Sequence, residues 1–487
     1  MSSLRNAAAL LAAAHTFPAL APLLPPLGFG TAIPLDAAAR RELGLDRTVR
    51  RGSIANGSGT LRALLLESVA DAPLRDTVSR AAAHVTARSP QLLWLLIVVH
   101  PATSSVVVAA PAPGARTRVA ALAVDAAHVT DSDGETLAAM ADAASGVDLL
   151  VHHRWRELLG RDALTRRFYR ELEGVVGELA ESAQGHAAAA ARRELALLCS
   201  SRVLFLAFLE AKGWLDGDRE FLRHAFDARC AAGGGVHRRL LDPLFFGTLN
   251  TPVARRAPAA RALGRIPFLN GGLFARGPLE RRTPDLRFTD ETLGRLIGGL
   301  LARYRVTAHE SSAAWTEAAI DPEMLGRAFE SLMAAGERRS SGAFYTPAAI
   351  IERVGGEGLD AALESLGVAA GVLGAARDHA PLAPADRERL RRALAALRVL
   401  DPACGSGAFL VHLLERIADL AAAAGDERGV GDRRRDALTR SVFGVDVNPT
   451  AVWLCELRLW LSVVIDAGES DPLAVRPLPN LDRHIRV

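Results

Sequence analysis

The sequence has almost no lysine and few cysteines. Lys212 is the only lysine among the 487 residues, so arginine supplies nearly all of the positive charge. The four cysteines, Cys199, Cys230, Cys404 and Cys455, form no Cys-x-x-Cys pair and no zinc-type spacing. These absences argue against a disulfide framework and against a zinc site, and we assign no metal ligand.

Long apolar runs are also absent. The longest, around Leu92 to Val99, is too short to cross a bilayer. The alanine run from Ala7 to Ala14 is short and is interrupted by His15, so we do not interpret it as a signal peptide. The sequence predicts a soluble, cytoplasmic protein, and its net charge of +3 permits a nucleic-acid partner without requiring one.

A glycine turn between a strand and a helix is the central feature of the sequence. Val399 and Leu400 lead into Asp401-Pro402-Ala403-Cys404-Gly405-Ser406-Gly407, and an apolar helical pattern follows from Phe409. Glycines at 405 and 407 let the backbone approach a ligand, and the start of the helix offers unpaired N–H groups. The pattern predicts the opening of a nucleotide-binding α/β unit.

A carboxylate follows the next predicted strand. The segment from Ser441 to Asp446 is a short apolar strand that ends in an acid, and a long apolar helix follows from Ala451. In such folds, an acid at the tip of the second strand binds the two ribose hydroxyls of a cofactor. We therefore expect Asp446 to contact a nucleoside.

These segments resemble the motifs of a known family. Asp401 to Leu410 closely resembles the S-adenosylmethionine motif of adenine-N6 DNA methyltransferases, and Gly444 to Pro449 resembles the second motif of that family. Gly342 to Pro347 resembles the Phe-Tyr-Thr-Pro motif that precedes them in members with the gamma motif order. The likeness covers residues 190 to 487 and is nearest to large methylases of restriction–modification and phage-defence systems, which the segments 266–274 and 321–326 also resemble.

The resemblance implies an α/β Rossmann-like methyltransferase core that binds S-adenosyl-L-methionine and acts on adenine N6 of double-stranded DNA. It places the cofactor against residues of all three motifs, namely Tyr345, Thr346, Pro347, Asp401, Pro402, Gly405, Gly407, Phe409 and Asp446.

We predict three domains. Residues 1–150 form a small α+β domain of unclear role, with a loosely packed lead-in over 1–55 and a helical pattern over 60–88. Its predicted strands are Leu92–Val99, Val106–Val108 and Val119–Val124.

The other two domains follow from composition and motifs. Residues 151–335 form a mostly helical domain of restriction–modification methylases. It includes a helix from Glu194 to Lys212, on which we expect Arg202 and Glu210 to be salt-bridged at the surface. Residues 336–487 form the N-terminal part of the S-adenosylmethionine-binding domain, so its α/β core is predicted to be incomplete at the C-terminus.

In fused restriction enzymes, the N-terminal region is where a nuclease would lie. The common metal-dependent nuclease site needs an acid on one strand and an acid and a lysine on the next. Because no lysine precedes Lys212, we expect an interaction or scaffolding domain instead.

The resemblance also implies a catalytic motif that this sequence does not contain. The family's Asn/Asp-Pro-Pro-Tyr/Phe segment accepts hydrogen bonds from adenine N6 and stacks on the extruded base. Here the only Pro-Pro pair is Pro25-Pro26, between Leu24 and Leu27, and Asp482 to Val487 resembles the approach to the family's third strand. We therefore assign no catalytic residue and expect the motif and target recognition to come from a missing C-terminal half or a separate polypeptide.

Three alternatives stay open at this point. The chain could be a non-catalytic DNA-binding or assembly subunit that retains a cofactor pocket. It could methylate a protein glutamine, although the large helical region and the 266–274 segment argue against this. A dinucleotide oxidoreductase would need a third glycine where this sequence has Leu410.

Overall fold

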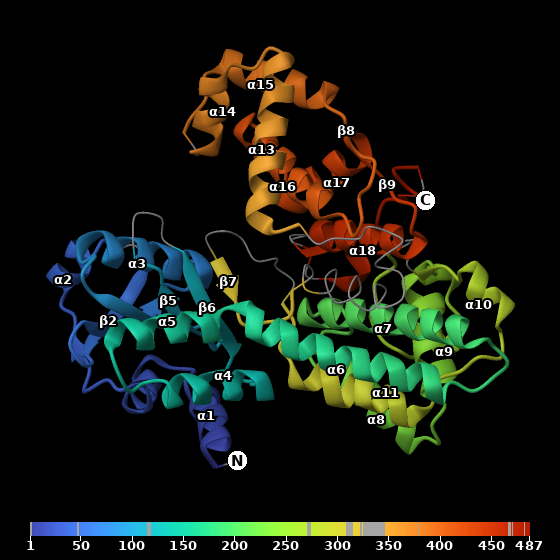
Figure 1. Cartoon of the computed structure of the whole chain (residues 1–487), viewed down its shortest axis with the longest axis horizontal. Coiled ribbons are helices and arrows are strands. Elements are labelled where there is room, and N and C mark those ends of the chain that lie inside the picture. The colour runs from blue at the N-terminus through green and yellow to red at the C-terminus, as the bar shows by residue number, and fades with distance from the viewer. Residues whose placement is uncertain are drawn as a thin grey trace. The chain divides into compact units, whose positions relative to one another are not determined.

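The computed structural model describes the chain except for residues 1, 46–47, 114–117, 270–273, 308–314, 322–323, 325–345, 379, 466–468, 470 and 482. The chain divides into two compact units (Figure 1). The first contains Met1–Arg170, Leu300–Val306 and Ser311–Ile320, and the second contains Glu171–Gly299, Thr307–Glu310 and Asp321–Val487. The three-domain division stays a prediction.

A seven-stranded sheet forms the centre of the first unit. Its strands lie in chain order, as β1 (Ile33–Pro34), β2 (Val49–Asn56), β3 (Leu61–Ser68), β4 (Leu93–Val99), β5 (Ser105–Pro111), β6 (Val119–Asp125) and β7 (Trp315–Glu317). The pairs β3–β4 and β6–β7 are parallel, and the other neighbours are antiparallel. The parallel pair β3–β4 needs a crossover, which helix α3 (Leu74–Arg88) provides.

Helices cover both faces of this sheet (Figure 1). Along β4, Leu95 and Ile97 join one hydrophobic cluster, while Trp94 and Leu96 join the other. The first cluster includes side chains of α1 (Ser2–Ala13), α4 (Asp131–Asp142) and α5 (Asp148–Leu159), and the second includes those of α3. A strand that is buried on both faces has a continuous apolar sequence, which explains the pattern of 92–99.

The predicted strands at 92–99, 106–108 and 119–124 are confirmed as β4, β5 and β6. The prediction of a loosely packed lead-in is wrong, because Leu11, Leu20 and Leu27 are buried in the first cluster. The helical prediction over 60–88 is wrong for its first part, where β3 lies at the centre of the sheet. Seven of the eight residues of β3 are buried, so its apolar sequence fits a strand as well as a helix.

Helices predominate in the first part of the second unit. Its main elements are α6 (Arg161–Ser182, which begins in the first unit), α7 (Ala189–Ala211), α8 (Phe221–Ala231), α9 (Pro258–Arg261), α10 (Pro278–Arg282), α11 (Asp290–Gly294) and the π-helical segments η3 (His237–Leu241), η4 (Pro243–Leu249) and η7 (Arg295–Leu301). The predicted helix from Glu194 to Lys212 is confirmed by α7.

The predicted surface position of Arg202 on α7 is wrong. Arg202 is only 3% exposed, and its two terminal nitrogens donate to the two carboxylate oxygens of Glu280 at 2.6 and 3.1 Å. The expected salt bridge therefore exists, but it is buried and joins α7 to α10.

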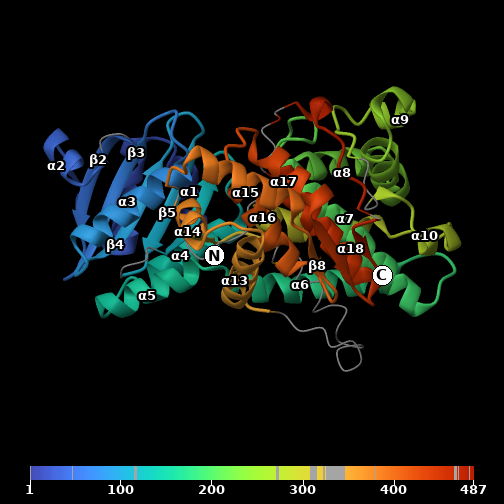
Figure 2. The same cartoon turned by 90° about the horizontal axis from the view of Figure 1, so that it is seen from above.

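A three-stranded parallel sheet organises the rest of the second unit. Its order is β10 (Ile485–Arg486), β9 (Val442–Val445) and β8 (Val399–Asp401), so β9 is central. Helices α16 (Ala408–Ala423), α17 (Val430–Arg440) and α18 (Pro449–Ile465) lie side by side next to it (Figure 2). Before β8 come α13 (Ala348–Ser365), α14 (Ala370–Arg377) and α15 (Pro384–Ala396).

This part confirms the predicted strand, glycine turn and helix, and its parallel α/β arrangement is Rossmann-like. The approach to a third strand is also confirmed, because Gly444 N–H donates to His484 C=O at 2.8 Å and Asp446 N–H to Arg486 C=O at 3.0 Å. No helix among the described residues is long and apolar enough to cross a membrane.

Glu210, near the end of α7, is partly buried, and its carboxylate forms no ion pair with any other residue that the structure describes, so the expected surface salt bridge is wrong. Its carboxylate accepts the Leu222 N–H at 2.7 Å, and burial raises the pKa of this carboxyl to about 7. The unfolded chain therefore releases this proton at a lower pH than the folded chain. The stabilisation that the protonated Glu210 carboxyl adds to the folded state is fully present below pH about 4.5 and is lost as the pH rises to about 7.

Glu210→Gln should remove this dependence, since a neutral amide oxygen can still accept the Leu222 N–H. We expect the variant to unfold with a free energy up to about 3 kcal/mol higher than the wild type at pH 8, because one pKa unit corresponds to about 1.4 kcal/mol. At pH 4 the two proteins should be equally stable. Denaturant titration at both pH values measures this, and an equal difference at both would contradict it.

Candidate functional site

The glycine turn lies at the carboxyl end of β8, where α16 begins. Gly405 and Gly407 have φ of +52° and +81°, in the left-handed region that favours glycine. Gly407 N–H donates to Cys404 C=O at 2.8 Å, and Gly407 C=O accepts the Val411 N–H at 2.9 Å. Gly407 therefore closes the turn and also caps α16.

The two glycines have different surroundings. A Cβ atom added at Gly407 would lie 2.6 Å from Sγ of Cys455 in α18, whereas one added at Gly405 would meet nothing within 4 Å. The close packing of the turn on α18 requires Gly407. Gly405 faces open space, into which a ligand can approach the backbone.

Asp446, directly after β9, is bonded to this turn. One carboxylate oxygen accepts the Gly405 N–H at 2.9 Å, and the other accepts the Asn448 N–H at 2.9 Å. Cys404 N–H also donates to Val445 C=O at 2.9 Å. The ends of β8 and β9 are thus joined side by side, and each oxygen of Asp446 keeps a lone pair for a further donor.

A second carboxylate, that of Asp401, lies at the same edge of the sheet. Burial raises the pKa of Asp401 above its ordinary value, the hydrogen bond from Ala403 N–H at 3.1 Å opposes the rise, and the negative charge of Asp446 adds to it. Two neighbouring carboxylates give this edge a negative potential, which favours a ligand that carries positive charge.

The remaining predicted site residues have varied positions. Pro402 is exposed in the turn, and Phe409 is half-buried in the first turn of α16. Thr346 and Pro347 precede α13, where the Pro347 C=O accepts the Ile350 and Ile351 N–H groups, so Pro347 caps the helix. Tyr345 lies outside the described residues.

Sequence reasoning missed Arg458. This residue of α18 is buried, and its Nη1 donates to Ser406 C=O and Oγ in the glycine turn at 3.1 and 3.3 Å. The available signal was an arginine in a strongly apolar helix, where Glu456 is the only other charged residue.

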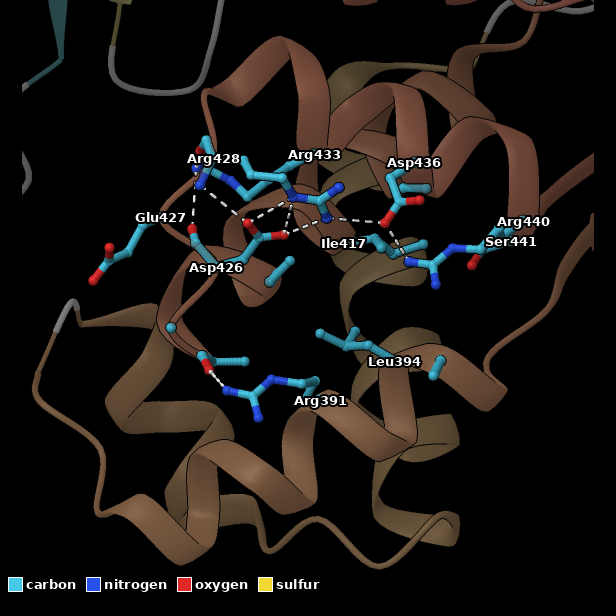
Figure 3. A pocket seen from close by; sticks show the side chains of 15 residues that line it. Arg391, Leu394, Ile417, Asp426, Glu427, Arg428, Arg433, Asp436, Arg440 and Ser441 are labelled. Carbon is cyan, nitrogen blue, oxygen red and sulfur yellow. Dashed lines mark hydrogen bonds and ion pairs between the residues drawn. The ribbon is translucent and has the colours of Figure 1, made fainter.

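A separate cavity of about 710 Å³ lies beside Ser441 (Figure 3). Ser441 precedes β9, whereas Asp446 follows that strand. Arg428 pairs there with Asp426 and Asp436, and Arg440 also pairs with Asp436. None of the predicted site residues lines this cavity. In the described part of the chain, no group of three or more histidine, cysteine or acidic side chains is placed to hold a metal ion.

Comparison with known families agrees with the geometry. Residues 378–466 match the family described as the DNA-methyltransferase domain of MmeI. This segment contains the glycine turn, Asp401 and Asp446, which the structure brings together. The chain resembles restriction–modification DNA methyltransferases.

Two relatives support this resemblance. The chain is 27% identical over 325 residues to a predicted type II restriction enzyme and methyltransferase of Methanocaldococcus jannaschii, a match that covers 61% of this chain and 27% of the relative. It is 38% identical over 72 residues to the adenine-specific methyltransferase PglX of Streptomyces coelicolor, covering 15% of this chain and 6% of that protein. The chain thus spans about a quarter of the first relative and less of the second.

Two solved structures also match. The type IIL restriction–modification enzyme MmeI in complex with DNA gives a TM-score of 0.42 at 21% identity, covering 64% of this chain and 39% of that one. The DrdV–DNA complex gives a TM-score of 0.29 at 13% identity, with coverage of 93% and 36%. Scores at this level do not establish a common fold.

Gly407→Ala should destabilise the second unit by about 2 kcal/mol or more, because a side chain at this φ is strained and its Cβ would overlap Cys455. Gly358→Ala is the matched control. Gly358 lies in α13 with open space around it, and alanine there should stabilise by about 0.5–1 kcal/mol. Thermal unfolding of both variants tests the contrast, and similar melting temperatures would contradict it.

Proposed function

We propose that the α/β part of this chain binds S-adenosyl-L-methionine for a site-specific DNA methyltransferase, which modifies adenine N6 in a restriction–modification or phage-defence system. The observation that carries the proposal is the hydrogen bond between Asp446 and the Gly405 N–H. It unites the acid of the second strand with the glycine turn, inside the segment that matches a methyltransferase family.

The described residues fit this cofactor. The backbone at Gly405 faces open space, and the Asp446 oxygens can accept ribose hydroxyls in addition to the two N–H groups. Val447, next to Asp446, is 84% exposed and offers an apolar side chain to a flat ring such as adenine. The negative potential from Asp401 and Asp446 favours the sulfonium and ammonium groups of the cofactor.

The cofactor supplies a methyl group that its sulfonium already activates, so no covalent intermediate with the protein is needed. The residues of this chain have the task of positioning. Asp446 and the turn fix the place of the nucleoside, and Gly405 keeps side chains out of that space. Thr346 and Pro347, with Tyr345, would contact the methionine end.

Adenine N6 needs hydrogen-bond acceptors to free its lone pair, and the base must leave the duplex to reach the methyl group. This sequence contains no Asn/Asp-Pro-Pro-Tyr/Phe segment that would do so. We assign that task, together with recognition of double-stranded DNA, to a polypeptide segment beyond this sequence or to a separate chain. The likeness to PglX over 72 residues supports adenine as the target.

Calorimetric titration of S-adenosylmethionine into the chain tests the cofactor site. We expect the wild type to bind and Asp446→Asn to bind at least about tenfold more weakly, because a charge-assisted hydrogen bond contributes roughly 1.5–3 kcal/mol. Asp436→Asn is the matched control, since Asp436 lines the cavity beyond the other end of β9 and should leave the affinity unchanged. A folded wild type that does not bind S-adenosylmethionine would contradict the proposal.

The reaction itself needs a second experiment. The chain is expressed in a methylation-deficient bacterial host, alone or with a polypeptide that carries the Asn/Asp-Pro-Pro-Tyr/Phe motif, and the genomic DNA is digested to nucleosides for mass spectrometry. We expect N6-methyladenine only when both chains are present. Methylated cytosine in its place would contradict the assignment of adenine, and N6-methyladenine from the chain alone would contradict the need for a second segment.

A further inference from the structure

Arg458 places a buried cation directly behind the glycine turn. Its side chain lies in α18 with 3% of its surface exposed, and it donates to both the carbonyl and the hydroxyl oxygen of Ser406, which is itself buried. Burial of a guanidinium is costly unless hydrogen bonds compensate it. Both hydrogen bonds to Ser406 help to compensate this cost, and Ser406 belongs to the glycine turn that the cofactor would contact.

The peptide group between Ser406 and Gly407 is held by hydrogen bonds at both ends, because the Gly407 N–H donates to Cys404 C=O and the Ser406 C=O accepts from Arg458. Glycine accepts positive and negative φ at similar energy, so Gly407 does not by itself hold the value of +81°. Rotation of this peptide group would remove the Gly407 N–H from Cys404 C=O and the Ser406 C=O from Arg458. The guanidinium thus holds one end of the same peptide group whose N–H closes the turn.

Each residue from Gly405 to Gly407 contacts the segment after β9. Asp446 accepts the Gly405 N–H, Cys455 packs against Gly407, and Arg458 donates to Ser406. Asp446 is placed to contact the nucleoside, and the Cys455 contact is steric. Arg458 acts on the turn from behind, through Ser406.

We infer that Arg458 is a positioning residue, which keeps the 405–407 turn in the shape that receives the cofactor. This inference rests on the proposed function of the same site. Arg458 would act on the cofactor only through Ser406, by holding the turn in its binding shape. Loss of the Arg458 side chain should therefore weaken cofactor binding without removing any contact to the cofactor.

The test compares Arg458→Met, Arg458→Lys and Arg434→Met. Arg434 is a matched control because it is also mostly buried in this part of the chain, where it donates to Ser462 C=O at 2.8 Å and pairs with Glu415 at 3.2 Å. Each variant is titrated with S-adenosylmethionine, and its thermal unfolding is recorded. Deuterium uptake of the peptide covering residues 401–410 is measured without cofactor.

We expect Arg458→Met to weaken binding about tenfold or more and to speed deuterium uptake in the turn, as loss of a charge-assisted hydrogen bond implies. Arg458→Lys should rescue most of the affinity, to within about threefold of the wild type, because an ammonium can still donate to the Ser406 carbonyl. Arg434→Met should lower the melting temperature but keep wild-type affinity and turn exchange.

The outcomes separate this inference from the proposed function. Wild-type binding with unchanged affinity in Arg458→Met overturns the role of Arg458 and leaves the proposed function intact. An equal loss of affinity in Arg434→Met also overturns it, because general destabilisation then explains both. A folded wild type that does not bind overturns the proposed function and this role together. Should Arg458→Met fail to fold, Arg458→Gln, whose side chain is shorter and neutral, takes its place. Weaker binding with faster turn exchange in Arg458→Gln then supports the role of Arg458, and wild-type values of both overturn it.

Discussion

The candidate site depends on one hydrogen bond, from the Gly405 N–H to the carboxylate of Asp446. It joins residues 41 positions apart in the chain and holds the ends of β8 and β9 together at the edge where a ligand can approach. Because the other oxygen of Asp446 accepts the Asn448 N–H, the carboxylate also shapes the start of α18. A single acid therefore organises both the floor of the site and the helix that packs behind it.

Helix α18 in turn fixes the shape of the glycine turn. Cys455 leaves no room for a side chain at Gly407, and Arg458 holds the carbonyl of Ser406. The segment from Asp446 to Arg458 thus contacts each of the three residues from Gly405 to Gly407. The geometry of the turn is a property of two segments packed together, which is why a glycine motif read alone has little predictive strength.

The sequence predicted the elements of this part well, because each has a local signal. The apolar pair before Asp401, the glycines at 405 and 407 and the acid after β9 correspond to a strand end, a turn and a second strand end. Arg458 could not be predicted in the same way, since its bond to Ser406 spans 52 positions and depends on how α18 packs. The cofactor roles of the site residues stay predictions, and Tyr345 lies outside the described residues.

The wrong predictions for the first unit and for α7 have a common physical cause, which is burial by partners that lie far away in the sequence. The residues of β3 and β4 are buried on both faces of the sheet, so hydrophobic periodicity could not distinguish strand from helix at 61–68. Leu11 and Leu20 were missed as core residues because an alanine- and proline-rich composition indicates loose packing, whereas their side chains fill the space beside the sheet. Arg202 was placed at the surface by its charge alone, without knowledge that Glu280 lies opposite.

The order of the parallel sheet has a consequence for handling the protein. Among the described residues, β8 has a neighbouring strand on one side only, and Leu400 within it is 63% exposed. The backbone N–H and C=O groups along that open side can pair with an extended segment of any other molecule. Self-association should thus increase with concentration, and a short peptide able to add a parallel strand there would act as a solubilising cap.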